Sequence, residues 1–182
     1  DEFNLEKLPR RKMQIDMHKY IDDEKVIYLK GLLHKLDYSA SSHLPIEIKN
    51  DFLITKFNEM LNRKNFKMNE LQNYCKNNSD ENLIIIAQTG MGKTEAALSW
   101  IENNKAFYFL PLRVSINSMY KRIVADIFEN KNYSNKIGLL HSDTKNIYNK
   151  DINDDDFLTH YKLSKNYSLP LTISTIDQLL NF

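Results

Sequence analysis

Short apolar runs alternate with helical patterns along most of the chain. The runs are too short for helices and are continuous rather than alternating, which is typical of strands buried on both faces of a sheet. Two such runs occur, at residues 83–86 and 106–110, and the segments at 136–140 and 171–174 are predicted as a third and a fourth strand. Helical patterns lie between them, notably at 95–103 and from Ser115 to about Asn130. This alternation predicts an α/β fold with a parallel, doubly wound sheet flanked by helices.

The N-terminal part of the chain has a different, all-helical pattern. Apolar residues recur at helical spacing between residues 23 and 41, namely Val26, Leu29, Leu33, Leu36 and Ala40, which predicts an amphipathic helix. Pro45 disfavours helical backbone at Leu44, so we place a domain boundary there. The predicted domains are therefore a helical part over 1–44 and an α/β domain over 45–182, which opens with helices over 46–64 and 68–77.

Asp37 does not fit the apolar stripe of the first helix. It lies at the border of the stripe, where an unpaired carboxylate would be expensive to bury. Two explanations stay open at this point. Either Ser41 or a neighbouring helix satisfies it by a hydrogen bond, or it is a metal ligand that works with residues outside this chain.

The composition excludes several classes of protein. Hydrophobic residues make up 42% and charged residues 27% of the 182, and no apolar run is long enough to cross a bilayer. The net charge of +1 gives no argument for nucleic-acid binding, and one cysteine, Cys75, excludes an internal disulfide. The chain lacks both a secretory signal and an initiator Met, so we expect a cytoplasmic piece of a longer protein.

The strongest chemical signal is the turn that follows the first apolar run. Gly90 and Gly92 let the backbone curl so that successive N–H groups point into one concavity, which suits a triphosphate. Lys93 would reach the terminal phosphates and the Thr94 hydroxyl would bind Mg²⁺, so these two are the candidate catalytic residues. The full predicted ATP site is Gln72, Ala87, Gln88, Thr89, Gly90, Met91, Gly92, Lys93, Thr94 and Glu95. The alternative is a chance turn between a strand and a helix.

Two positions around this loop favour a motor over a small-molecule kinase. Ala87 stands where such loops usually begin with glycine, a substitution familiar among helicases. Gln72 lies sixteen residues before Gln88, and in helicases a glutamine at about this distance hydrogen-bonds the adenine edge with one amide. A solvated helix glutamine is the alternative for Gln72.

Polar groups follow three successive predicted strands. Carboxyl ends of parallel strands meet at one edge of a sheet, where functional groups gather. Small polar and basic side chains there hold a phosphate backbone without reading bases, so we predict a nucleic-acid site made by Arg113, Ser115, His141, Ser142 and Thr175. Taken singly, each group could be a turn residue or a helix cap, and Ser115 is also the predicted N-cap of its helix. Residues 143–168 are predicted to form a polar insertion with an acidic surface loop, and its spacing excludes a calcium loop.

These motifs together resemble those of the CRISPR-associated helicase-nuclease of type I systems, a superfamily two DNA helicase with an N-terminal HD nuclease domain. The stretches that carry the resemblance are residues 87–97, 110–120, 139–142 and 172–180, which look like successive helicase motifs, and 31–41, which is similar to the last helix of the HD domain. The stretch at 110–120 is much more specific to the family than the phosphate-binding loop.

The resemblance implies a RecA-like first helicase domain that binds ATP and Mg²⁺. It also implies translocation along single-stranded DNA, the non-target strand of an R-loop opened by a guide-RNA surveillance complex. Asp37 falls on the final metal-ligand aspartate of the HD site, which would hold a divalent transition metal for DNA cleavage.

The sequence also departs from the family pattern. The tandem His-Asp pair of the nuclease and the Asp-Glu-x-His element expected soon after Gln178 are missing. We therefore expect this chain alone to be nearly inert in catalysis. Alternatives are another superfamily two motor, such as a restriction-enzyme translocase, or a nucleotide-binding remnant without turnover.

Overall fold

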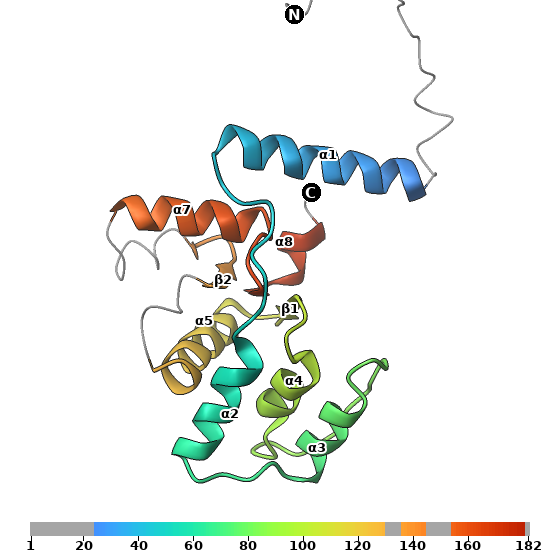
Figure 1. Cartoon of the computed structure of the whole chain (residues 1–182), viewed down its shortest axis with the longest axis vertical. Coiled ribbons are helices and arrows are strands. Elements are labelled where there is room, and N and C mark those ends of the chain that lie inside the picture. Colours follow the sequence, from blue (N-terminus) through green and yellow to red (C-terminus); the bar gives the residue numbers. More distant parts are fainter. Residues whose placement is uncertain (1–23, 130–135, 145–153, 181–182) are drawn as a thin grey trace, which may run out of the picture.

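The structure is a computed structural model, which describes residues 24–129, 136–144 and 154–180 (Figure 1). In chain order the elements are the helices α1 (Glu24–Ser41), α2 (Leu53–Arg63), α3 (Glu70–Asn77) and α4 (Lys93–Ile101), strand β1 (Ala106–Phe109), helix α5 (Arg113–Arg122), the π-helix η3 (Ile123–Ile127), strand β2 (Ile137–Leu140), helix α7 (Asp154–Lys165), strand β3 (Leu171–Ser174) and helix α8 (Ile176–Leu180).

Three of the four predicted strands form one parallel sheet in the order β1-β3-β2. The central strand β3 begins opposite Ala106 on one side and Ile137 on the other, and it ends at Ser174. Strands β2 and β3 are buried along their whole length, although β3 includes the polar residues Thr172 and Ser174. The predicted α/β class with a parallel sheet flanked by helices is confirmed.

The remaining predicted strand, at residues 83–86, does not form, so this prediction is wrong. These residues are not in a strand, and Ile84 and Ile86 are 96% and 97% exposed. In the described part of the chain the sheet consists of β1, β3 and β2 alone, and neither outer strand takes this run as a neighbour. An apolar run without a pairing partner has no ladder to stabilise it, so it remains an extended connection between α3 and the loop before α4.

The main core lies between the sheet and the helices α2, α4 and α5 (Figure 1). Phe57, Leu98, Ile116 and Ile173 are fully buried there, one from each of α2, α4, α5 and β3. Burial of such side chains contributes roughly 2 to 3 kcal/mol each. This packing fixes the loop before α4 relative to α5 and the strand ends.

Two local predictions need correction. Ser115 is not a helix cap: α5 begins at Arg113 with Leu112 as its N-cap, no side chain caps it, and the helix passes into the π-helix η3 at Ile123. The polar insertion is also not a loop throughout, because its second part forms α7. That helix packs on β2 and buries Phe157 and His160, which sit three residues apart on one helical face.

Helix α1 forms as predicted, but its apolar stripe is not buried. Leu29 and Leu33 are 54% and 65% exposed, and Ser39 is the buried residue of the helix. Its C-terminal end is tied to the sheet domain, where Asn166 Nδ2 donates to Ser39 Oγ at 2.8 Å and Lys35 pairs with Glu47. The boundary between 1–44 and 45–182 stays a prediction.

Among the described ranges, no helix is both long and apolar enough to span a membrane.

Candidate functional site: a phosphate-binding loop beside a basic pocket

The loop before α4 has the backbone conformation that its glycines suggest. Gly90 and Gly92 have φ angles of +87° and +76°, in the left-handed region that other residues rarely adopt. Gly92 is the N-cap of α4, and none of the described side chains caps that helix. The N–H groups of its first turn are therefore left for another acceptor, and the positive end of the helix points toward the loop.

Lys93 lies against this loop. Its Nζ donates to the carbonyl oxygens of Ala87 at 2.8 Å and Gln88 at 2.9 Å. The next residue, Thr94, is 8% exposed. The ammonium is thus held at the loop itself, close to any anion that binds the N–H groups of α4.

Gln72 is buried in the first turn of α3 and forms a capping box with Asn69, the N-cap of that helix. Its Oε1 accepts from Asn69 N at 3.1 Å, while Asn69 Oδ1 accepts from Gln72 N at 3.0 Å, which is a capping box. The same residues meet the loop: Asn69 Nδ2 donates to Met91 O at 3.1 Å, and a Cβ on Gly92 would lie 2.4 Å from Gln72 Nε2. The alternative of a solvated glutamine is wrong, since Gln72 is 7% exposed.

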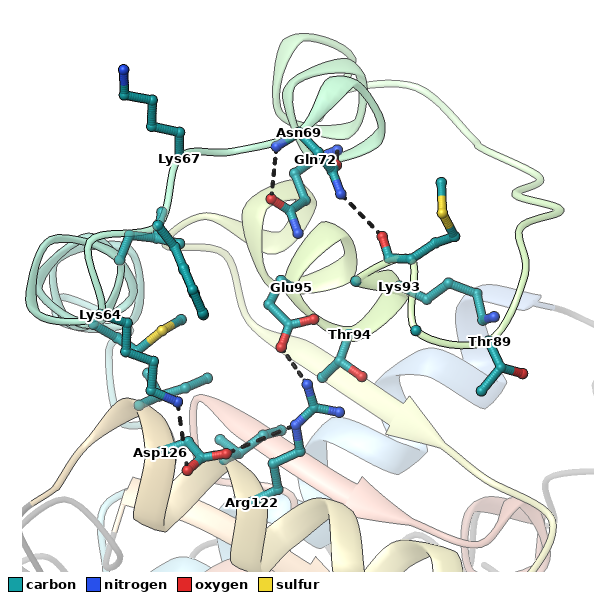
Figure 2. Close-up of a pocket in the computed structure, with 18 residues that line it drawn as sticks. Lys64, Lys67, Asn69, Gln72, Thr89, Lys93, Thr94, Glu95, Arg122 and Asp126 are labelled. Atoms are coloured by element: carbon teal, nitrogen blue, oxygen red, sulfur yellow. Dashed lines mark hydrogen bonds and ion pairs between the residues drawn. The ribbon is translucent and has the colours of Figure 1, made fainter.

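The loop forms one wall of a pocket of about 540 Å³, whose other walls come from the ends of α2, α3 and α5 (Figure 2). Of the ten residues predicted for the ATP site, all line it except Ala87 and Gln88, whose carbonyls accept from Lys93 instead. The charged lining residues are Lys64, Lys67, Lys93, Arg122, Glu95 and Asp126. Cations outnumber carboxylates, which suits an anionic ligand.

Part of this pocket was missed by sequence reasoning. Asn69 could have been found, because Asn-Glu-Leu-Gln at 69–72 has the spacing of a capping box. Lys64 and Phe66, which follow α2, and Arg122 and Asp126, which lie at the junction of α5 and η3, carry no local signal. Tertiary packing alone brings these distant segments to the loop.

The predicted strand-end groups meet at one edge of the sheet. Arg113 Nη1 donates to Ser142 Oγ at 2.9 Å and also pairs with Asp143. His141 Nε2 lies 2.8 Å from Asn117 Oδ1, and burial lowers the pKa of His141, so the ring stays neutral more readily than a solvated histidine.

These groups differ in their accessibility to a ligand. Arg113 and Ser142 are exposed, whereas His141 and Thr175 are only 4% and 5% exposed. Ser115 is partly buried in the first turn of α5. Of these predicted groups only Arg113 and Ser142 are exposed, and their polar atoms are bonded to each other while Arg113 also pairs with Asp143.

Asp37 is exposed on α1, so it carries no burial cost. Ser41 Oγ donates to Tyr38 O at 3.1 Å rather than to this carboxylate. Within the described ranges no three His, Cys, Asp or Glu side chains are grouped so that they could hold a metal ion. A metal role for Asp37 therefore stays a prediction.

Two known proteins are similar to this chain. It is 29% identical over 101 residues, 54% of its length, to the CRISPR-associated nuclease/helicase Cas3 of Methanothermobacter thermautotrophicus (strain ATCC 29096 / DSM 1053 / JCM 10044 / NBRC 100330 / Delta H). It is 31% identical over 131 residues, 64% of its length, to a protein of Methanocaldococcus jannaschii (strain ATCC 43067 / DSM 2661 / JAL-1 / JCM 10045 / NBRC 100440) named provisionally as a CRISPR-associated nuclease/helicase Cas3.

The matched parts span 12% and 17% of these two relatives, respectively. No protein-family model matches the chain, and no solved structure does. The names of both relatives agree with the motif resemblance. The chain is thus similar in sequence, over 54% and 64% of its length, to part of two proteins named as CRISPR-associated nuclease/helicases.

Proposed function

We propose that the chain binds ATP with Mg²⁺ in the pocket beside the 87–95 loop. The observation that carries this proposal is the uncapped N-terminus of α4 behind two positive-φ glycines, with Lys93 held at the same loop. Helix N-termini of this kind bind phosphate through free N–H groups and the helix dipole. The surplus of cationic side chains around the pocket supports a polyphosphate ligand.

The residues of the pocket fit distinct parts of the nucleotide. The N–H groups at the start of α4 would hold the phosphates, and the Lys93 ammonium would turn from the loop carbonyls to the terminal phosphates. The Thr94 hydroxyl, which lines the pocket, would bind Mg²⁺. The Gln72 amide, also in the lining, is the candidate partner of the adenine edge.

In the whole protein, we propose that ATP binding and hydrolysis drive movement along single-stranded DNA. Arg113 and Ser142, exposed at the carboxyl edge of the sheet, would contact phosphates of the strand. The names of the two relatives, nuclease/helicase, support coupling to DNA cleavage. In that protein Asp37 would contribute to a divalent transition-metal site, and a guide-RNA surveillance complex would supply the opened DNA.

A second candidate is nucleotide binding without turnover by this chain alone. The observation that favours it is the 83–86 run, which leads into the loop but is not anchored in the sheet. Because a motor must transmit force from the loop to the sheet, a loop without that anchor suits binding better than translocation.

Calorimetric titration with Mg²⁺-ATP tests the proposed site. The chain is expected to bind ATP, and Lys93→Ala is expected to weaken binding at least about tenfold, because a charge-assisted contact to phosphate is lost. Lys30→Ala, on exposed α1, is the matched control and should bind as wild type. Absence of ATP binding by the unmodified chain, or equal binding by Lys93→Ala, would overturn the proposal.

An ATPase assay with and without single-stranded DNA separates the two candidates. The whole protein is expected to hydrolyse ATP faster when the DNA is added, and Lys93→Ala is expected to abolish this activity. For the chain alone, binding without hydrolysis supports the second candidate, whereas DNA-stimulated turnover would exclude it.

A further inference from the structure

Arg122 joins two carboxylates at the side of the pocket. Its Nη2 pairs with Glu95 from the first turn of α4, and its Nε lies 3.9 Å from Asp126 Oδ2, as the dashed lines in Figure 2 show. Asp126 also pairs with Lys64 at 3.7 Å, at the end of α2. Four elements, α2, α4, α5 and η3, are thus connected through one chain of charges around the pocket.

Arg122 stands at the junction between α5 and a π-helix. The residue ends α5 and is the N-cap of the π-helix η3, a form that is rare and frequent at functional sites. Ile123, Asp126 and Ile127 of this π-helix all line the pocket together with Arg122. The wider turn therefore delivers a cation and a carboxylate to the same wall.

Glu95 poses an electrostatic problem for a phosphate site. Its carboxylate directly follows Thr94, lines the pocket and is 22% exposed. An acidic residue in the first turn of a helix stabilises that helix, but it also repels an anion bound to the same N–H groups. A nearby opposite charge offsets that repulsion.

We propose that Arg122 is a positioning residue for nucleotide binding: by pairing with Glu95 it neutralises this carboxylate and holds it away from the phosphates. The inference rests on the proposed function of the pocket as an ATP site. It predicts that replacing Arg122 lowers nucleotide affinity, and that the loss grows with the number of phosphates. The reason is that the unpaired charge of Glu95 would repel the phosphates and not the base.

The test is a calorimetric comparison of ATP, ADP and AMP, each with Mg²⁺, on the whole chain. Arg122→Gln is expected to weaken ATP binding about three- to tenfold, ADP less and AMP least. Adding Glu95→Gln to this variant should restore ATP affinity to within about twofold of wild type. Lys121→Gln removes an exposed charge from the same helix and is the control for net charge, with wild-type affinity expected.

Equal loss for the three nucleotides, a loss that Glu95→Gln leaves in place, or no loss at all would overturn the inference. Arg122→Lys gives an independent check, since it keeps the charge: affinity within about twofold of wild type supports neutralisation, and a tenfold loss would assign Arg122 a geometric contact instead. Failure of the unmodified chain to bind ATP overturns the proposed function. Tight ATP binding that depends on Lys93 but not on Arg122 overturns only this inference.

Discussion

Arg113 donates a hydrogen bond of 2.9 Å to Ser142 Oγ across 29 residues of sequence, and the same guanidinium pairs with Asp143. The first residue of α5 is thereby connected to the turn that follows β2. A phosphate that approached this edge would find the guanidinium already engaged by a carboxylate. Asp143 is thus expected to compete with single-stranded DNA for Arg113.

Asp143→Asn is therefore expected to tighten single-stranded DNA binding roughly three- to tenfold, because the competing charge is removed. Arg113→Ala should weaken binding by a similar factor and reduce its dependence on salt, since one phosphate contact is lost. Fluorescence anisotropy with a labelled oligothymidine measures both. Asp80→Asn, at an exposed position in a distant turn, controls for net charge. If both Asn variants gained DNA affinity equally, Asp143 would have no specific effect on Arg113.

Gly92→Ala is expected to destabilise the fold by about 1 to 3 kcal/mol and to weaken ATP binding. The new Cβ would lie 2.4 Å from Gln72 Nε2, at a backbone φ of +76° that alanine disfavours. Gly31→Ala is the matched control, because Gly31 lies inside α1 with nothing within 4 Å of the added carbon. Urea unfolding should show the control at least as stable as the parent; a fall in both variants would contradict the explanation.

Acid should destabilise the protein through His160. Burial lowers the pKa of this histidine from 6.5 to about 4, while its Nε2 lies 3.0 Å from the Ile137 carbonyl oxygen on β2. Between these two pKa values the unfolded chain binds more protons than the folded one. The free energy of unfolding therefore falls as the pH drops from 6.5 toward 4, on the order of 3 kcal/mol in total.

Denaturant unfolding at several pH values, with His160→Gln beside the parent, measures this contribution. The variant keeps a neutral donor and should lose less stability across the same pH interval. Parallel curves for the two proteins would show that other groups cause the acid sensitivity.

The exposed isoleucines before the loop should matter little for folding. Ile86→Ala is expected to change the free energy of unfolding by less than about 0.5 kcal/mol, because Ile86 is 97% exposed. Ile173→Ala in the central strand should cost about 2 to 5 kcal/mol, since that side chain is fully buried. Thermal or urea unfolding of both variants measures this difference. A large loss of stability in Ile86→Ala would show that the 83–86 run is part of the core.

Local patterns predicted the loop and three strands well. The φ angles at Gly90 and Gly92 follow from residue type, and the burial of β2 follows from its sequence Ile-Gly-Leu-Leu, which has no polar side chain. The run at 83–86 has the same local character as those strands. Sheet membership, however, requires a partner that the run itself does not specify.

Burial was harder to predict than secondary structure. The stripe that includes Leu29 and Leu33 correctly indicated a helix but is exposed, because nothing in the described part of the chain covers it. Conversely, the polar composition before Asn166 suggested a surface loop, yet Phe157 and His160 at helical spacing are enough to pack α7 on β2. Arg122 reaches Glu95 only through tertiary packing, which no spacing in the sequence encodes.

The bare stretch at 83–87 has a consequence for handling the purified chain. Its five residues, Leu-Ile-Ile-Ile-Ala, contain no charge, proline or glycine, and two of its side chains are almost fully in water. Uncharged β-branched segments of this kind pair edge to edge with copies of themselves. The segment that leads into the nucleotide loop is thus the part of the chain from which aggregation would begin in concentrated samples.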